Sequence, residues 1–70
     1  MKMTFKTVVV KDGSGFAWDG YEDGPEIIDT PVLVKEKDID EYLVDIKAHA
    51  EDLSIDLPEL EIKTVNLEIV

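Results

Sequence analysis

Carboxylates are the only chemically active side chains that this sequence supplies in number. Its 70 residues include 17 Asp and Glu against seven Lys and one His, with no Arg and no Cys. No thiolate or disulfide can form without Cys, a lone His49 cannot complete a zinc site, and no nucleophilic triad can be assembled around Ser14 or Ser54. Carboxylate pairs perform acid–base catalysis only in a pocket that separates their pKa values, which so short a chain is not expected to form. We therefore predict a protein that is not an enzyme and that needs no metal or other cofactor.

One group of acids lies in the segment 19–29, which we predict to be a partner-binding loop region. The segment resembles a calcium-binding loop only faintly, because Tyr21 occupies a ligand position and Thr30 stands where a bidentate Glu is required. An aromatic residue among charges is a common anchor of protein interfaces, so Tyr21 is predicted to contact the partner. The predicted binding residues of this group are Asp19, Tyr21, Glu22, Asp23, Glu26 and Asp29.

A second group of acids lies on one side of a predicted helix over residues 38–53. At about 100° per residue, four carboxylates fall in one narrow sector beside the apolar side of this helix. They are Asp38, Glu41, Asp45 and Asp52. Their axial spacings of ~4.5, ~6 and ~10 Å, at ~1.5 Å per residue, are comparable to the spacing of phosphates on a duplex. Like charges so placed cost a few tenths of a kcal/mol per pair, which favours a binding role over a stabilising one.

The charges are segregated along the chain. Residues 1–11 carry three Lys and no acid, whereas residues 12–34 carry six acids and no Lys, and the net charge of the whole chain is −10. Repulsion from phosphates and the absence of Arg argue against direct binding to nucleic acid. The expected partner is a basic protein, toward which a field of carboxylates would steer the encounter.

The helix that carries the second group is the clearest element of the sequence. Its apolar residues recur at helical spacing and comprise Ile39, Tyr42, Leu43, Ile46, Ala50 and Leu53. Asp38 and Glu41 have the spacing of a capping box at its start, and Asp56 to Pro58 ends the pattern.

Strands are predicted around this helix. Residues 3–11 end in three consecutive Val, residues 11–15 contain an Asp-Gly turn signal, and residues 16–19 return as a hairpin strand with Trp18 expected in the core. Residues 26–35 form a strand that Pro31 should confine to an edge or divide in two. Residues 60–70 form the last strand, and its change in alternation predicts a bulge near Thr64 and Val65.

The order of elements predicts a single α+β domain over residues 1–70. A mostly antiparallel sheet of three to four strands carries one helix, in the order βββαβ. A chain of this size without disulfides has marginal stability, so a homodimer is expected. No apolar run is long enough for a membrane span and no secretory signal is evident, which predicts a cytoplasmic location.

In size, charge and layout, the whole chain resembles the small acidic host-takeover proteins of lytic phages, and among them the DNA mimics that inhibit the bacterial nucleoid protein HU. The resemblance depends on the segment Met1 to Lys6, the acidic loop Asp19 to Asp29 and the helix Asp38 to Leu53. It implies an inhibitor that competes with DNA for HU or a similar host protein. The first strand, which carries Lys, departs from a uniformly acidic surface and is expected to face a dimer mate or the back of the molecule.

A second hypothesis stays open beside this one. A small antitoxin or regulatory subunit that neutralises a basic nuclease would present the same charge and the same small α+β layout.

Overall fold

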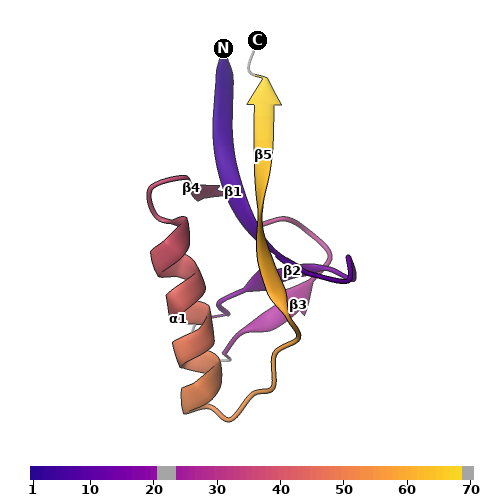
Figure 1. Ribbon diagram of the computed structural model, residues 1–70, viewed down its shortest axis with the longest axis vertical. Helices are drawn as coiled ribbons and strands as arrows, with labels where there is room; N and C mark the ends of the chain where they lie inside the picture. The colour runs from indigo at the N-terminus through magenta and orange to yellow at the C-terminus, as the bar shows by residue number, and fades with distance from the viewer. Residues whose placement is uncertain (21–23, 69–70) are drawn as a thin grey trace.

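The fold is an antiparallel sheet with one helix packed against it, as the computed structural model describes it for residues 1–20 and 24–68 (Figure 1). Its elements are β1 (Lys2–Val10), β2 (Phe16–Trp18), β3 (Glu26–Ile28), β4 (Val34–Lys35), α1 (Ile39–Asp52) and β5 (Leu60–Glu68). The predicted α+β class is confirmed. Four strands precede the helix because the predicted strand 26–35 is divided in two.

Strand β1 is the centre of the sheet. It pairs with β5 over its whole length, from Lys2 opposite Glu68 to Val10 opposite Leu60. It also pairs with β4 near Phe5 and with β2 near Val9. The predicted β1–β2 hairpin is therefore confirmed, and the long β1–β5 ladder joins the two ends of the described chain.

The division around Pro31 follows the expected backbone chemistry. Proline has no N–H to donate to a ladder, and residues 29–33 contain no strand. The two pieces separate to different neighbours: β3 pairs with β2, with Ala17 opposite Ile27, while β4 pairs with β1.

Helix α1 spans Ile39–Asp52, close to the predicted range, and buries Ile39, Ile46 and Ala50. The predicted capping box is wrong, because the Asp38 side chain makes no cap hydrogen bond. Asp38 has φ −103° and ψ −7°, near the helical region, whereas a capping side chain normally acts from an extended backbone. The carboxylate of Asp38 is therefore left facing solvent.

The core lies between α1 and the sheet, where Val8, Ala17, Ile39 and Ile46 pack together. Alternation on β2 directs Ala17 into this core, and Trp18 next to it is only partly buried. The expectation that Trp18 fills the core is thus wrong by one residue. Its neighbour in sequence takes that place because β2 is only three residues long and presents its middle residue to the helix.

The predicted bulge in the last strand is also wrong, because the β1–β5 register runs without interruption. Leu60 and Ile62 share the sheet side of Val8, which faces the core, whereas Val65 and Leu67 point to the other side. The change of phase reflects a change in which side of the strand is apolar, and not an extra residue.

Residues 2–6 of β1 and 64–68 of β5 form what we call the ribbon. Figure 1 shows it rising beyond α1 and β4 at the upper end of the molecule, where the N-terminus and the end of β5 lie together. The molecule is elongated as a result, with principal extents of 43, 23 and 17 Å. Within the described part of the chain, no helix is both long and apolar enough to cross a membrane.

Candidate partner-binding surface

The four helix carboxylates form what we call the acidic stripe: Asp38, Glu41, Asp45 and Asp52. All four are exposed. The first three line one shallow, open hollow of about 170 Å³ together with Val34 and Tyr42. Asp52 lies two turns beyond Asp45, near the end of α1. The structure therefore brings three members of the stripe together and places the fourth at the far end of the helix.

No lysine neutralises this stripe within residues 1–20 and 24–68. The lysine ion pairs found there join Lys6 to Glu36 at 4.0 Å and Lys11 to Glu59 at 3.6 Å. None of the four stripe carboxylates takes part in an ion pair in the described chain. The stripe consequently presents its negative charge to solvent.

The acids of segment 19–29 are less uniform than the sequence suggests. The carboxylate of Asp19 accepts a hydrogen bond from His49 Nδ1 at 2.9 Å, and only 26% of the Asp19 side chain is exposed. The backbone N–H of Asp19 also donates to the Tyr42 hydroxyl at 3.4 Å. Asp19 thus ties the segment to α1, and its carboxylate is largely engaged within the chain.

Other members of this segment lie at the surface or beyond the described residues. Glu26 and Asp29 are exposed, and Asp29 accepts a hydrogen bond from the Thr30 hydroxyl at 3.3 Å. The predicted contacts Tyr21, Glu22 and Asp23 lie outside the described residues.

The glycines on either side of residues 21–23 hold the base of that loop. A Cβ on Gly20 would overlap the carbonyl oxygen of Gly24, so the two backbones approach closely. A Cβ on Gly24 would lie 2.6 Å from Leu53 Cδ1 and 2.8 Å from Ile55 Cδ1. The base of the loop is therefore packed against the chain just after α1.

The cluster of Asp19, Tyr42 and His49 is a feature that sequence reasoning missed. Tyr42 and His49 are seven residues apart, so two helical turns place them on the same side of α1. The sequence pattern places Tyr42 with the apolar side of the helix, and it offers His49 only as a lone residue that cannot complete a zinc site. The signal in the sequence is that Tyr42 and His49 lie two turns apart next to the apolar side of the helix. Partly buried polar groups there need a hydrogen-bond partner, which another element has to supply.

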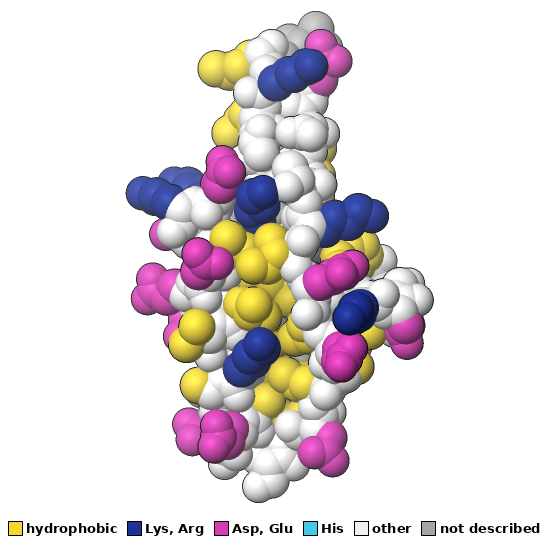
Figure 2. Space-filling view, viewed as in Figure 1, with side chains coloured by type: hydrophobic (Ala, Val, Ile, Leu, Met, Phe, Trp, Pro, Cys, Tyr) yellow, Lys and Arg dark blue, Asp and Glu magenta, His cyan; other side chains and the backbone are white. Residues whose placement is uncertain are grey.

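Figure 2 shows how the charges are distributed on one face. Acidic side chains lie along the outer side of α1 and at the lower end of the molecule, while apolar surface lies between α1 and β5. In the described chain no group of three or more His, Asp or Glu is placed to hold a metal ion.

Among the described residues, the carboxyl group of Asp12 has a clearly altered acidity. The pKa of Asp12 is lowered because the Ser14 side chain and then the Ser14 backbone N–H donate hydrogen bonds to its carboxylate. Asp12 lies in the β1–β2 turn and its shift reflects local turn geometry. The acidic stripe is suited to recognition by charge because its four carboxylates are exposed.

Comparison of the chain with protein-family models, curated proteins and solved structures finds no match.

Proposed function

We propose that the protein is a DNA-mimic inhibitor that covers the DNA-binding surface of a basic host protein, with a nucleoid protein such as HU as the favoured target. The observation that carries this proposal is the acidic stripe, an exposed row of carboxylates that no lysine neutralises in the described chain. In this role the protein acts by occupancy, and it works in the cytoplasm of an infected bacterium.

The rigidity of the helix supports this function. Ile46 is fully buried and Ile39 is 5% exposed, so the side of α1 next to the stripe is anchored in the core. Charges held at fixed positions pay less ordering cost on binding than charges on a mobile tail. A basic groove shaped for regularly spaced phosphates would therefore bind this stripe more tightly than an equally acidic disordered segment.

The physical effect on the partner would be competition. A protein that binds DNA through Lys and Arg depends on electrostatic contacts that added salt weakens. The acidic stripe offers charges of the same sign to the same residues, so bound duplex and bound inhibitor exclude each other.

The test is displacement of fluorescently labelled duplex DNA from a purified HU protein, followed by anisotropy at several salt concentrations. The wild-type chain should release the duplex, and added salt should weaken the release. In the variant Glu41→Gln/Asp45→Asn, two exposed charges are lost, and we expect a weakening of about 2- to 30-fold from ~0.2–1 kcal/mol per pair.

The matched control is Asp40→Asn/Glu51→Gln. It removes the same charge from two exposed positions of the same helix that lie outside the sector of the stripe. Displacement within about twofold of wild type is expected. Equal weakening by both variants would show that net charge acts without the stripe, and an inactive wild-type chain would reject DNA mimicry toward HU.

The same assay separates the nuclease-inhibitor alternative. An antitoxin-like protein would leave HU on its duplex and instead be captured by a basic nuclease whose binding duplex DNA does not compete away.

A further inference from the structure

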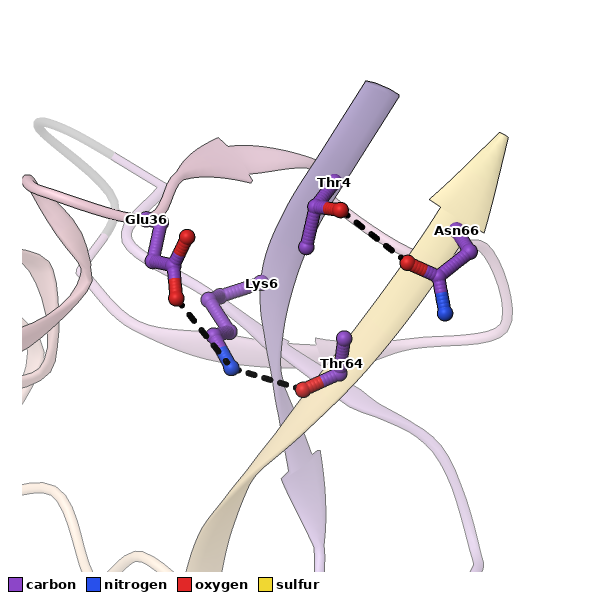
Figure 3. A network of polar contacts seen from close by, with 5 residues as sticks. All are labelled: Thr4, Lys6, Glu36, Thr64 and Asn66. Atoms are coloured by element: carbon purple, nitrogen blue, oxygen red, sulfur yellow. Dashed lines mark hydrogen bonds and ion pairs between the residues drawn. The ribbon is translucent and has the colours of Figure 1, made fainter. Parts of the chain in front are cut away.

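The ribbon has one polar and one apolar side. On the polar side, the Thr4 hydroxyl donates to Asn66 Oδ1 at 3.1 Å and Lys6 Nζ donates to Thr64 Oγ1 at 2.6 Å (Figure 3). Lys6 also reaches Glu36 at 4.0 Å, which links this side of the ribbon to the segment after β4. These polar side chains hydrogen-bond to one another across the two strands and are accessible to water, so they need no contact with another molecule.

The opposite side of the same strands is apolar. The register sets Met3 opposite Leu67 and Phe5 opposite Val65, so these four side chains share one side of the ladder. Met3 and Leu67 are each 39% exposed, and Phe5 and Val65 are partly exposed. Further down the same side, Thr7 and Val9 are buried. The apolar side is therefore covered where the sheet is broad and uncovered where it narrows to the ribbon.

A two-stranded ribbon with one bare apolar side is poorly stabilised in isolation. Strand pairs in water need a third strand or a packed hydrophobic side for independent stability. Beyond β4, which pairs only with Phe5 and Lys6, the described ribbon has no third strand. Within residues 1–20 and 24–68, this side of the ribbon is therefore left open to contact with another molecule.

We propose that the other molecule is a second copy of the chain, which packs the apolar side of its own ribbon against the first. The contact is isologous, so Met3, Phe5, Val65 and Leu67 of one copy meet the same four residues of the other. This inference locates a dimer interface and does not rest on the proposed inhibitory function.

Charge selects the second copy over a basic partner. Within the ribbon the charged residues are Lys2, Lys6 and Glu68, whereas the rest of the chain carries the entire negative excess. Two copies approaching by any strongly acidic surface would repel each other, and the ribbon is where they can meet without opposing carboxylates. A basic partner, in contrast, would be drawn to the acidic stripe and not to an apolar side that carries no carboxylate within the ribbon.

A dimer in which the apolar sides of two ribbons pack together buries more apolar surface than a dimer in which two strand edges pair. The outer edge of β5 has no partner strand in the described chain, so two copies could in principle align there. Such an edge contact would extend the sheet but leave the apolar sides of both ribbons in water. Only face-to-face packing removes them from solvent.

The small area of the apolar side of the ribbon limits the expected affinity of the dimer. A standard interface takes about 800 Å² from each partner, roughly one-sixth of the 5083 Å² surface of this chain. Four side chains per copy lie at the small end of that scale, so association at roughly 1–100 μM is expected.

The experiment is sedimentation velocity of the full chain between roughly 0.5 and 500 μM, which brackets the expected dissociation constants of about 1–100 μM. The wild type should pass from one to two chain masses over this range. Leu67→Glu should sediment as a monomer throughout, whereas Asn66→Glu, which adds a comparable charge at the next residue but on the polar side, should dimerise within about threefold of wild type.

A milder pair guards against misfolding of the charged variants. Met3→Ser removes apolar surface without adding charge and should raise the dimer dissociation constant about tenfold, while Thr4→Ser on the polar side should leave it nearly unchanged. Far-UV circular dichroism checks that every variant is folded. A wild-type monomer at 500 μM would overturn the proposal and assign the patch to a different partner. Equal losses in the variants of both sides would overturn face-to-face packing.

Discussion

The helix and the ribbon use their exposed surface in opposite ways. Along α1, the buried side holds the core together and the acidic stripe beside it presents unneutralised charge. In the ribbon, the polar side carries paired hydrogen-bonding groups and the other side leaves four apolar residues in water. The helix is anchored by buried side chains, and its stripe carboxylates take part in no ion pair in the described chain. The ribbon carries few charges and leaves apolar side chains exposed. The difference separates the surface proposed to bind a charged partner from the surface proposed to bind another copy.

Truncating the same amount of aliphatic side chain in each region tests this difference most strongly. Ile46→Ala removes a fully buried side chain and should lower the free energy of unfolding by about 2–5 kcal/mol. Leu67→Ala, at a residue 39% exposed, should cost about 1 kcal/mol or less in dilute monomer. Urea unfolding at low protein concentration measures both. Comparable losses would mean that the ribbon is as well packed as the helix.

Two glycines provide a second comparison, between the base of the acidic loop and the β1–β2 turn. Gly13 and Gly24 have φ of 83° and 81°, so Ala is strained at both by about 1–2 kcal/mol. A Cβ on Gly13 meets nothing within 4 Å, whereas one on Gly24 meets Leu53 and Ile55. Gly24→Ala should therefore cost roughly 1–3 kcal/mol more than Gly13→Ala in thermal or urea unfolding. Equal losses of stability in the two variants would show that Leu53 and Ile55 move aside with little loss of free energy when a Cβ is added at Gly24.

Loss of the Asp45 charge should affect stability in the opposite direction to its effect on binding. Asp45→Asn relieves repulsion from Glu41 four residues before it, while Glu41 keeps its favourable place in the first turn of α1, and should raise the free energy of unfolding by about 0.2–0.5 kcal/mol. The gain should shrink in high salt, because salt screens the repulsion in the wild type. A loss of stability in this variant would mean that the stripe serves the fold and would weaken its assignment as a binding surface.

The smallest expected effect concerns the turn between β1 and β2. Because the folded-state pKa of Asp12 is lowered from 3.8, its carboxylate stabilises the fold above that pH, and this contribution is lost as the pH falls through the folded value. The melting temperatures of wild type and Asp12→Asn should therefore converge as the pH is lowered from 6 to below 3.8. A constant difference across this range would show that the ionised form has no special role in the turn.

The sequence predicted those parts of the fold that are determined by local patterns. Helical spacing from Ile39 to Leu53 located α1, Asp12-Gly13 located the hairpin, and Pro31 marked the division of one strand into two. These features depend on backbone preferences of neighbouring residues, which the sequence displays directly.

What the sequence did not predict depends on contacts between distant residues. The phase change around Thr64 was interpreted as a bulge, because only the partner strand reveals that β5 faces the core at one end and solvent at the other. Asp19 was counted with the free acids, because its engagement by His49 joins residues 30 positions apart. The exposure of the acidic stripe followed from helix geometry alone, whereas the hollow around Asp38, Glu41 and Asp45 needed Val34 from another element.

The β1–β5 ladder has a consequence for how the chain folds. Its contacts span nearly the whole sequence, with a sequence separation of 62 between Thr4 and Asn66, so the most extensive pairing of the sheet is also the slowest to close. Until β5 arrives, Val8, Val9 and Val10 lie on a strand without its main partner, and such a strand is prone to intermolecular aggregation. The high net charge of −10 then keeps unfinished chains apart during that interval.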